Sequence, residues 1–376
     1  MSMSGLAAAS IVPTRLLVLQ PTGFCNINCR YCYLADRQAR RKMRTSTVRA
    51  LGRFLGTIQV AEKPLTVSWH AGEPLTAGRD FYESAFSILA ESPDCPPLRH
   101  TIQTNATLIN NQWCELFTRW GVHVSVSLDG PAHIHDRERR DTGNRGTYAR
   151  ALAGFESLLK HDITVSTIGV LTYYAMQFPD EIFRFWRSIG VRSVAIIAEE
   201  ADGANRVSSL SRVDAGSRYY GFLRRLLELR DQYPEIHIRE LEFVEQALRC
   251  APGLEVASME NTPGAIISVD TEGNISTFSP ELLDQGHQSY GNFTWGNVNN
   301  HTWDEVVGHE KFIGVAKDIR LGVDRCRAEC GFYVVCGGGA PSNKISENGT
   351  FISTDTVACR LRIMTATEAV LDHYGL

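Results

Sequence analysis

The sequence predicts an α/β fold, an open partial (β/α)6 barrel followed by a small cysteine-rich α+β domain. Over roughly the first 235 of its 376 residues, short β-rich runs alternate with helical patterns. Such alternation is typical of a parallel sheet with right-handed crossovers, and six units are too few for a closed eight-unit barrel. Near residue 235 the alternation gives way to a turn-rich segment with its own cysteines. A doubly wound sheet is the alternative architecture.

The elements follow from apolar periodicity and turn signals. The expected strands are Leu16–Gln20, Leu65–Trp69, Leu98–Gln103, Val122–Ser127, Val165–Leu171 and Ser193–Ala198. The expected helices are Thr45–Ile58, Phe81–Leu89, Gln112–Trp120, Tyr148–His161, Pro179–Ile189 and Ser211–Tyr233. A hairpin is expected from Ile266–Val269 and Asn274–Thr277, around the turn residues Glu272 and Gly273. The expected divisions are a flexible tail (1–14), the partial barrel (15–235) and the cysteine-rich domain (236–376).

Composition excludes several classes of function. The net charge of −4 gives no general attraction for nucleic acid. No apolar run approaches the roughly 18 residues of a membrane span, and the N-terminus does not resemble a signal peptide. We therefore expect a cytoplasmic protein that binds neither nucleic acid nor membrane, whose ten cysteines serve metal binding more than disulfides. The basic run 37–44 is either a solvated helix face or a docking patch for an acidic partner.

The first cysteine group follows the first expected strand. Cys25, Cys29 and Cys32 have the spacing C-x3-C-x2-C. A [4Fe–4S] cluster usually takes four cysteines, so three would leave one iron open for chemistry. Loops at the carboxyl ends of parallel strands also commonly carry active sites. A zinc site is the alternative, but zinc sites of this kind favour C-x2-C pairs and a fourth ligand nearby.

This spacing, with an aromatic residue before the third cysteine, resembles the radical S-adenosylmethionine (SAM) superfamily. The resemblance implies that the open iron binds SAM, that the reduced cluster cleaves it to a 5′-deoxyadenosyl radical, and that Tyr31 lies against the adenine. His70 to Pro74 resembles the G-G-E-P motif, with Ala71 in place of its first glycine. The resemblance further implies SAM contacts after successive strands, from Gly72, Glu73, Asn105, Ser127 (ribose), Asp129 and Arg139 (carboxylate, with Arg140 as the alternative).

The second cysteine group lies near the C-terminus. Its members are Cys326, Cys330, Cys336 and Cys359, enough to ligate a second cluster fully, and Gly337–Gly339 would let backbone N–H groups reach the sulfurs. This region resembles the SPASM extension of radical SAM peptide-modifying enzymes, which usually carries two auxiliary clusters. Ala340 and Phe278 stand where that pattern has cysteines. We therefore expect two [4Fe–4S] clusters in all, one binding SAM and one auxiliary, with structural zinc as the alternative.

Two segments narrow the resemblance further. Residues 276–283 and 199–203 look like the maturases of glycine-rich-repeat peptides, which form three-residue cyclophanes. This implies a ribosomally made precursor peptide as substrate and a flavodoxin or ferredoxin as reductant. Such a crosslink needs a base for the ring proton, and the candidates are Glu199, Glu200 and Glu281. Glu199 and Glu200 are equally compatible with a solvated loop or with binding a cationic side chain of the peptide.

Other activities stay open from the sequence. An anaerobic sulfatase maturase, which makes formylglycine, is similar through the barrel but carries both auxiliary clusters. Another radical SAM peptide modification, such as thioether formation or epimerisation, is also compatible. A non-catalytic protein with zinc at both cysteine groups is the alternative outside enzymes.

Overall fold

The computed structural model describes residues 11–250 and 256–376. One sheet of ten strands runs through it in the order β12-β9-β8-β1-β2-β3-β4-β5-β6-β7. Strands β1 to β7 are parallel and follow one another in chain order. They are β1 (Leu16–Leu19), β2 (Leu65–Trp69), β3 (Leu98–Thr104), β4 (His123–Ser127), β5 (Val165–Leu171), β6 (Ser193–Ala198) and β7 (His237–Ile238).

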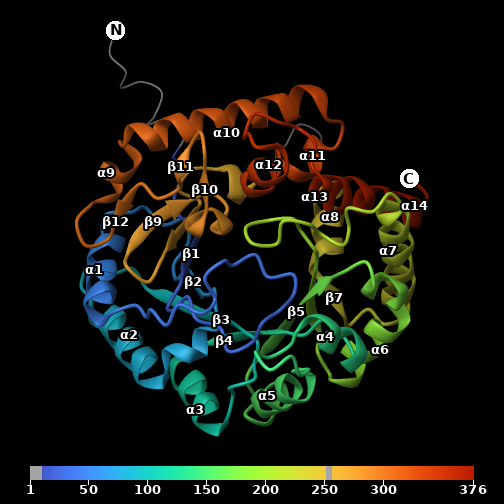
Figure 1. The fold of residues 1–376 in the computed structure, drawn as a ribbon, viewed down its shortest axis with the longest axis horizontal. Helices are drawn as coiled ribbons and strands as arrows, with labels where there is room; N and C mark the ends of the chain where they lie inside the picture. The colour runs from blue at the N-terminus through green and yellow to red at the C-terminus, as the bar shows by residue number, and fades with distance from the viewer. Residues whose placement is uncertain (1–10, 251–255) are drawn as a thin grey trace.

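The helices that follow these strands lie outside the curved sheet (Figure 1). They are α1 (Thr45–Leu55), α2 (Arg79–Glu91), α3 (Asn111–Trp120), α4 (Ala132–Glu138), α5 (Tyr148–Lys160), α6 (Pro179–Ser188), α7 (Ala215–Gln232) and α8 (Arg239–Arg249). The sequential strand order confirms the partial barrel and rules out the doubly wound alternative, in which the strand order reverses. The short helix α4 was not expected from the sequence.

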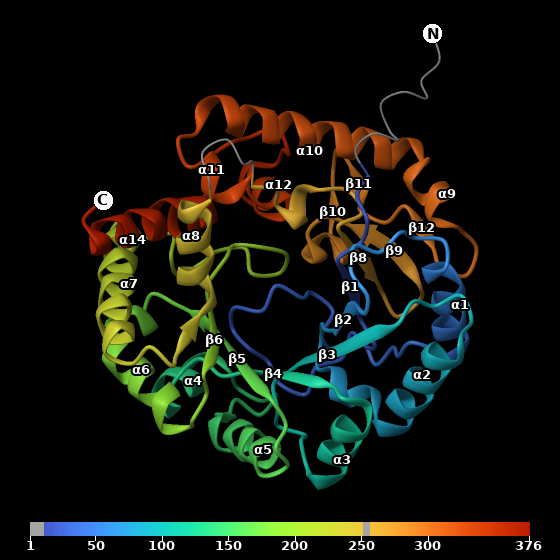
Figure 2. The same cartoon turned by 180° about the vertical axis from the view of Figure 1, so that it is seen from behind.

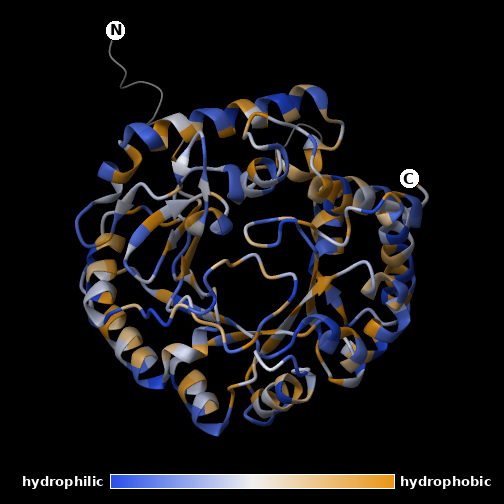
Figure 3. Ribbon diagram, viewed as in Figure 1, coloured by the Kyte–Doolittle hydropathy of each residue, from blue (hydrophilic) through white to orange (hydrophobic). Residues whose placement is uncertain are grey.

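The helices form because each buries one apolar stripe against the sheet. Helix α1 buries Val48, Leu51 and Phe54, spaced three residues apart on one face. Figure 3 shows hydrophobic colour on the parts of the helices that face the sheet and hydrophilic colour outside. The ends carry sequence signals as well, since Asn110 caps α3 by accepting from Trp113 N, and Gly121 ends it in the left-handed conformation.

The C-terminal part continues the same sheet. Its strands β8 (Ile266–Val269), β9 (Asn274–Thr277) and β12 (Gly296–Asn297) belong to that sheet. Strands β10 (Gly286–His287) and β11 (Gly291–Asn292) pair antiparallel in a separate sheet. Its helices are α9 (Trp303–Val307), α10 (Glu310–Glu329), α11 (Tyr333–Cys336), α12 (Pro341–Asn348), α13 (Val357–Cys359) and α14 (Ala366–Tyr374). The expected hairpin is confirmed as β8 and β9, which pair antiparallel.

This part touches both edges of the open barrel. Strand β8 pairs parallel with β1, so the hairpin extends the sheet at its first strand. At the other edge, α14 packs on α7 and α8, and α8 packs on β6. Figures 1 and 2 show α10 to α13 bridging the space between these edges. One apolar core also includes residues from both parts, so the boundary expected near residue 235 interrupts neither the sheet nor the core.

The start of the described chain belongs to the folded body. We expected a flexible tail through residue 14, of which residues 1–10 lie outside the described part. Thr14 is buried, pairs with Val60, and donates its N–H to Gln59 O at 2.7 Å. Within residues 11–250 and 256–376, none of the helices has the length and apolar character needed to cross a membrane.

Candidate active site and cysteine groups

The first three cysteines sit on the long loop that joins β1 to α1. Figure 1 shows this loop in blue, inside the ring of strands and helices. Cys25 and Cys29 are buried and pack with Tyr31 and Cys32. The loop is fixed by Cys25 N, which donates to Arg37 O at 2.9 Å, and by the Arg37 guanidinium, which donates to Cys29 O at 2.8 Å. The three thiols are therefore held together at the carboxyl end of the sheet.

Burial keeps these thiols protonated in the absence of a metal. Burial and the nearby Glu73 charge raise the pKa of Cys25 to about 12, and burial raises the pKa of Cys29 to about 11. Iron replaces the protons on such thiols. Across residues 11–250 and 256–376, no three His, Cys, Asp or Glu side chains converge as the ligands of one metal ion would. The ligands of a [4Fe–4S] cluster attach to separate irons, so they need not converge on one point as the ligands of a zinc ion do.

Glu73 links the second and third strand ends. Its carboxylate accepts from Leu75 N at 3.0 Å, Thr104 Oγ1 at 2.6 Å and Asn105 N at 2.7 Å. Burial raises its pKa to about 6, while these hydrogen bonds act in the opposite direction. The Asn105 side chain donates toward Cys25 Sγ at 4.0 Å. Glu73 thus orients the strand ends around the cysteine loop through contacts within the protein.

The turn before Glu73 lies tight against the cysteine loop. Gly72 has a φ of +59°, and a Cβ there would lie 2.6 Å from Phe24 O. No side chain fits that space, which explains a glycine at this position. Ala71, the departure from the family motif, has a φ of 73°. An alanine there costs about 1–2 kcal/mol relative to glycine, so this turn is held in place by its surroundings.

Tyr31, Asp129 and Arg139 form one buried group. The Tyr31 hydroxyl donates to Asp129 Oδ2 at 2.5 Å, and Arg139 Nε donates to Asp129 Oδ1 at 3.0 Å. The Arg139 guanidinium carbon lies 5.4 Å from the centre of the Tyr31 ring. The three residues expected to contact SAM therefore meet, with Arg139 paired to Asp129. Arg140, the alternative to Arg139, donates to Asp136 O and Asn144 Oδ1 instead.

Ser127, at the end of β4, lies next to the third strand. It is buried, and the Gln103 side chain donates to its Oγ at 2.9 Å. Gln103 lies on β3, so this bond joins neighbouring strand ends. The position agrees with a group at the reactive edge of the sheet.

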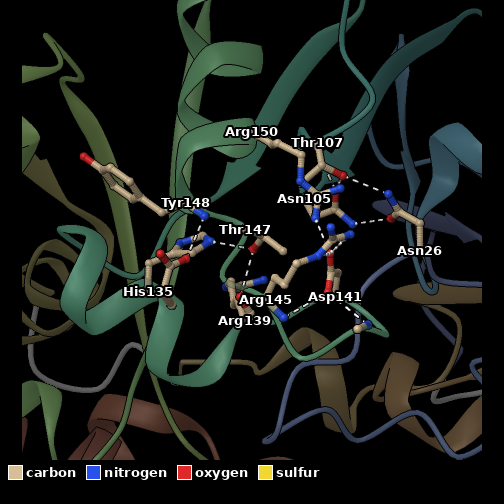
Figure 4. A network of polar contacts seen from close by, with 12 residues as sticks. Asn26, Asn105, Thr107, His135, Arg139, Asp141, Arg145, Thr147, Tyr148 and Arg150 are labelled. Atoms are coloured by element: carbon tan, nitrogen blue, oxygen red, sulfur yellow. Dashed lines mark hydrogen bonds and ion pairs between the residues drawn. The ribbon is translucent and has the colours of Figure 1, made fainter.

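Several supporting residues were missed by sequence reasoning. Figure 4 shows Asn105 bonded to Asn26 and Thr107, and Thr147 bonded to His135 and to the backbone of Arg139. The Thr147 hydroxyl donates to Arg139 O at 2.9 Å. These contacts brace the residues expected to bind SAM. Asn26 is 79 residues from Asn105, whereas Thr107, Thr147 and His135 lie within 12 residues of their partners but follow no motif that the sequence analysis used.

The three candidate bases have different surroundings. Glu199 is buried and accepts from Ser209 N at 3.0 Å, so it holds its own loop. Glu200 pairs with Arg362 at 2.5 Å. The Glu281 carboxylate has no hydrogen-bond partner on another described residue, and burial together with the Glu260 charge raises its pKa to about 8. Of the three, Glu281 is the carboxyl that is not engaged by another described residue.

The second cysteine group gathers around the glycine run. Cys326 lies in the last turn of α10 and Cys330 caps that helix, while Cys336 ends α11 and Cys359 ends α13. Burial and the neighbouring Cys336 and Cys330 raise the pKa of Cys359 to about 12. Burial raises the pKa of Cys336, while hydrogen bonds from the Gly338 and Gly339 backbones act to lower it. These thiols are therefore close neighbours. Backbone N–H groups of the glycine run donate to the Cys336 sulfur, as we expected from the sequence.

Aromatic packing occupies the position where the family pattern has a further cysteine. Phe278 is fully buried, with ring centres 6.0 Å from Trp295 and 6.1 Å from Phe312. Ala340 precedes α12 as its N-cap and contributes no thiol. Cys250 is exposed and donates to Gln246 O within its own helix. At Phe278, where the family pattern has a cysteine, this chain therefore has an aromatic side chain that packs in the apolar core.

Comparison with known proteins agrees with these features. A sequence model of the Radical SAM superfamily matches residues 19–185. The chain is 40% identical over 365 residues to an uncharacterized protein of Synechocystis sp., which covers 96% of this chain and 92% of that protein. It is 31% identical over 199 residues to the serine-type anaerobic sulfatase-maturating enzyme of Klebsiella aerogenes, which covers 52% of this chain and 49% of the enzyme.

Two solved structures share the fold. Native anSMEcpe with bound AdoMet and Cp18Cys peptide has a TM-score of 0.78 at 18% identity and covers 96% of this chain and 97% of that one. SuiB of Streptococcus suis bound to the precursor peptide SuiA has a TM-score of 0.66 at 18% identity and covers 93% of this chain and 76% of that one.

Proposed function

This chain belongs to the radical SAM superfamily, and from that premise we propose that it is a peptide maturase that forms three-residue cyclophanes. The substrate is a ribosomally made precursor peptide. The enzyme removes a side-chain β-hydrogen and joins that carbon to an aromatic ring carbon two positions away. A peptide substrate is supported by the fold neighbours bound to Cp18Cys and SuiA.

Residues of the cysteine loop and strand ends bind the cofactors. Cys25, Cys29 and Cys32 hold one [4Fe–4S] cluster, and Cys326, Cys330, Cys336 and Cys359 hold the other. When bound, the first supplies the electron that cleaves SAM to methionine and a 5′-deoxyadenosyl radical, and the second supplies a one-electron acceptor. A flavodoxin or ferredoxin supplies the reducing electron.

Tyr31, Asp129 and Arg139 orient SAM. Because the Asp129 carboxylate pairs with Arg139 Nε and the Tyr31 hydroxyl, the ring and the guanidinium are fixed before SAM arrives. Such preorganisation lowers the entropic cost of binding. The remaining guanidinium nitrogens of Arg139 pair with the SAM carboxylate.

One observation carries the cyclophane assignment. The two segments that resemble cyclophane maturases contact each other. Gln285, just after the second segment, donates to Asp202 in the first at 2.6 Å. Glu281, in the second segment, lies near enough to Glu200 and Asp202 for their charges to raise its pKa. A carboxyl group with a pKa of about 8, which accepts a proton when ionised, therefore lies near the contact between the two segments.

The reaction balances with these groups. The peptide loses two hydrogens. One leaves the β-carbon as a hydrogen atom to the 5′-deoxyadenosyl radical, and the other leaves the ring as a proton to the Glu281 carboxylate. The remaining electron goes to the one-electron acceptor. The new carbon–carbon bond forms between these two stages, and aromaticity returns when the ring proton leaves.

The test is mass spectrometry of a small peptide encoded next to this protein, after co-expression with it under anoxia. The expected product is lighter by two hydrogens per crosslinked motif, with fragmentation suppressed between the joined residues. A product in which a Cys or Ser has become formylglycine, with no crosslink, would contradict the cyclophane assignment.

Formylglycine formation is the second candidate. The 31% identity to a serine-type sulfatase-maturating enzyme favours it. Phe278 and Ala340 count against it, because such enzymes carry both auxiliary clusters in the family pattern. Incubation with a sulfatase peptide bearing Cys or Ser separates the two candidates.

A further inference from the structure

Lys344 is a buried lysine beside the second cysteine group. It is 5% exposed and lies on α12. Its ammonium donates to Cys326 Sγ at 3.3 Å and to Gly322 O at 3.1 Å. Lysine is almost never fully buried unless it is paired. Among the described residues, no carboxylate forms an ion pair with Lys344, and its hydrogen-bond acceptors are the Cys326 sulfur and the Gly322 carbonyl.

The surrounding fold holds this contact in place. A Cβ at Gly322 would lie 2.0 Å from Phe351 O and 3.2 Å from Lys344 Nζ. A side chain at this point of α10 would collide with the Phe351 carbonyl and press on the Lys344 ammonium, so a glycine here allows the close packing of α10 against both. Ile319 and Val323 line the same small cavity around the lysine side chain. The aliphatic stem is therefore enclosed by apolar groups, and the charge is directed at Cys326.

We propose that Lys344 sets the reduction potential of the cluster held by Cys326, Cys330, Cys336 and Cys359, by directing an N–H donor and a positive charge at the Cys326 sulfur. The inference rests on the proposed second cluster. Adding an electron makes such a group more negative, and a nearby cation and hydrogen bonds to sulfur favour that reduced form. Lys344 thereby makes this site a better acceptor for the electron that the peptide loses.

The test uses the full-length chain with Cys25, Cys29 and Cys32 replaced by alanine, so that only the four-cysteine group holds iron. In this background, Lys344→Met removes donor and charge, and Lys344→Gln keeps a donor without charge. Lys317→Met, at an exposed position on α10, is the matched control. Iron and sulfide are measured per chain, and the potential is measured by redox titration followed by electron paramagnetic resonance.

The parent should hold roughly four irons per chain. In Lys344→Met, the ratio of reduced to oxidised cluster at a fixed potential should fall about tenfold, which corresponds to about 59 mV for one electron. Lys344→Gln should lie between, and Lys317→Met should equal the parent. A merely structural lysine would not shift the potential of a fully loaded site.

The other outcomes are also decisive. Full iron with an unchanged potential in Lys344→Met overturns the inference. If Lys344→Met loses its iron but Lys344→Gln keeps iron and has an intermediate potential, the inference is supported. If both variants lose their iron, Lys344 has a structural role and the inference is overturned. No iron in the parent removes the second cluster and the inference with it. Formation of 5′-deoxyadenosine by the unsubstituted chain tests the SAM-cleaving site separately. A failure of the proposed function can therefore be distinguished from a failure of the inference about Lys344.

Discussion

Gln285 donates its side-chain amide to Asp202 Oδ1 at 2.6 Å, across 83 residues of sequence. The same oxygen accepts from Ser346 Oγ at 2.5 Å. The loop after β6, the segment after β9 and helix α12 therefore meet at one carboxylate. This junction joins the barrel to the C-terminal part. It brings Glu281 to the place where we propose that the peptide reacts.

The first prediction concerns Glu281. Glu281→Gln removes the proposed base, so crosslinking should fall by about 10²–10⁴-fold while SAM cleavage to 5′-deoxyadenosine continues. Both products are measured by liquid chromatography and mass spectrometry in the same reaction. Glu199→Gln is the matched comparison, since Glu199 is bonded within its own loop. Equal crosslinking by the Glu281 variant and the parent would remove Glu281 as the base.

The pH dependence of crosslinking follows from the same residue. Because the pKa of Glu281 is raised to about 8, the carboxyl is mostly protonated at pH 7 and cannot accept the ring proton. Crosslinks per 5′-deoxyadenosine should therefore rise with pH, reach half of their maximum near pH 8 and level off above about pH 9. The ratio is measured across this range in parent and Glu281→Gln. A ratio that does not change with pH in the parent would contradict the assignment.

Asp129→Asn should destabilise the protein strongly. The substitution keeps the shape but leaves the buried Arg139 without its counter-charge, and side-chain exposures of 8% and 1% show that water does not compensate. The expected loss is about 3–5 kcal/mol of unfolding free energy, measured by chemical denaturation. Asp180→Asn, in a half-exposed pair with Arg225, should cost no more than about 1 kcal/mol. Similar losses in the two variants would show that the buried pair is not special.

Gly72→Ala should disturb the cysteine loop. A Cβ at Gly72 would lie 2.6 Å from Phe24 O, so the loop must shift and iron binding should fall. Gly121→Ala is a matched control, because Gly121 has the same φ of +59° with nothing within 4 Å of the added carbon. Each variant incurs about 1–2 kcal/mol for the backbone conformation. Iron loss is therefore expected only in Gly72→Ala, and full iron in that variant would contradict the crowding argument.

Phe278→Ala tests whether this position serves packing alone. Removing a fully buried ring should cost about 3–5 kcal/mol of stability, with iron content per folded chain unchanged. Phe243→Ala, at a 44% exposed position, should cost much less. Loss of iron without loss of stability in Phe278→Ala would show that this position still supports a metal site.

The sequence was sufficient for elements with a strong local signal. Leu65–Trp69, Val165–Leu171 and both hairpin strands match the structure at their ends, because apolar runs and turn residues define them locally. Helix α4 was missed, since its seven residues have a weak apolar pattern around His133 and Asp136. The junction of the C-terminal part with β1 was also missed, because pairing between β8 and β1 depends on contacts across the whole chain.

The candidate site divides in the same way. Positions such as Tyr31, Asp129 and Arg139 could be named from the resemblance to the radical SAM superfamily, and the structure brings them together. The contacts between site residues could not be predicted, because Glu73 and Asn105, for example, meet only when two strand ends lie side by side. The difference between Glu199 and Glu281 likewise depends on tertiary contacts, since both are simply acidic residues after strands in the sequence.

The most direct test measures 5′-deoxyadenosine from SAM under strict anoxia, with the parent and with a variant in which Cys25, Cys29 and Cys32 are all alanine. We predict nucleoside formation by the reconstituted parent and only background formation by the variant, which should lack one cluster's worth of iron. Undiminished nucleoside formation by the alanine variant would contradict the central claim that these three thiolates hold the cluster that cleaves SAM.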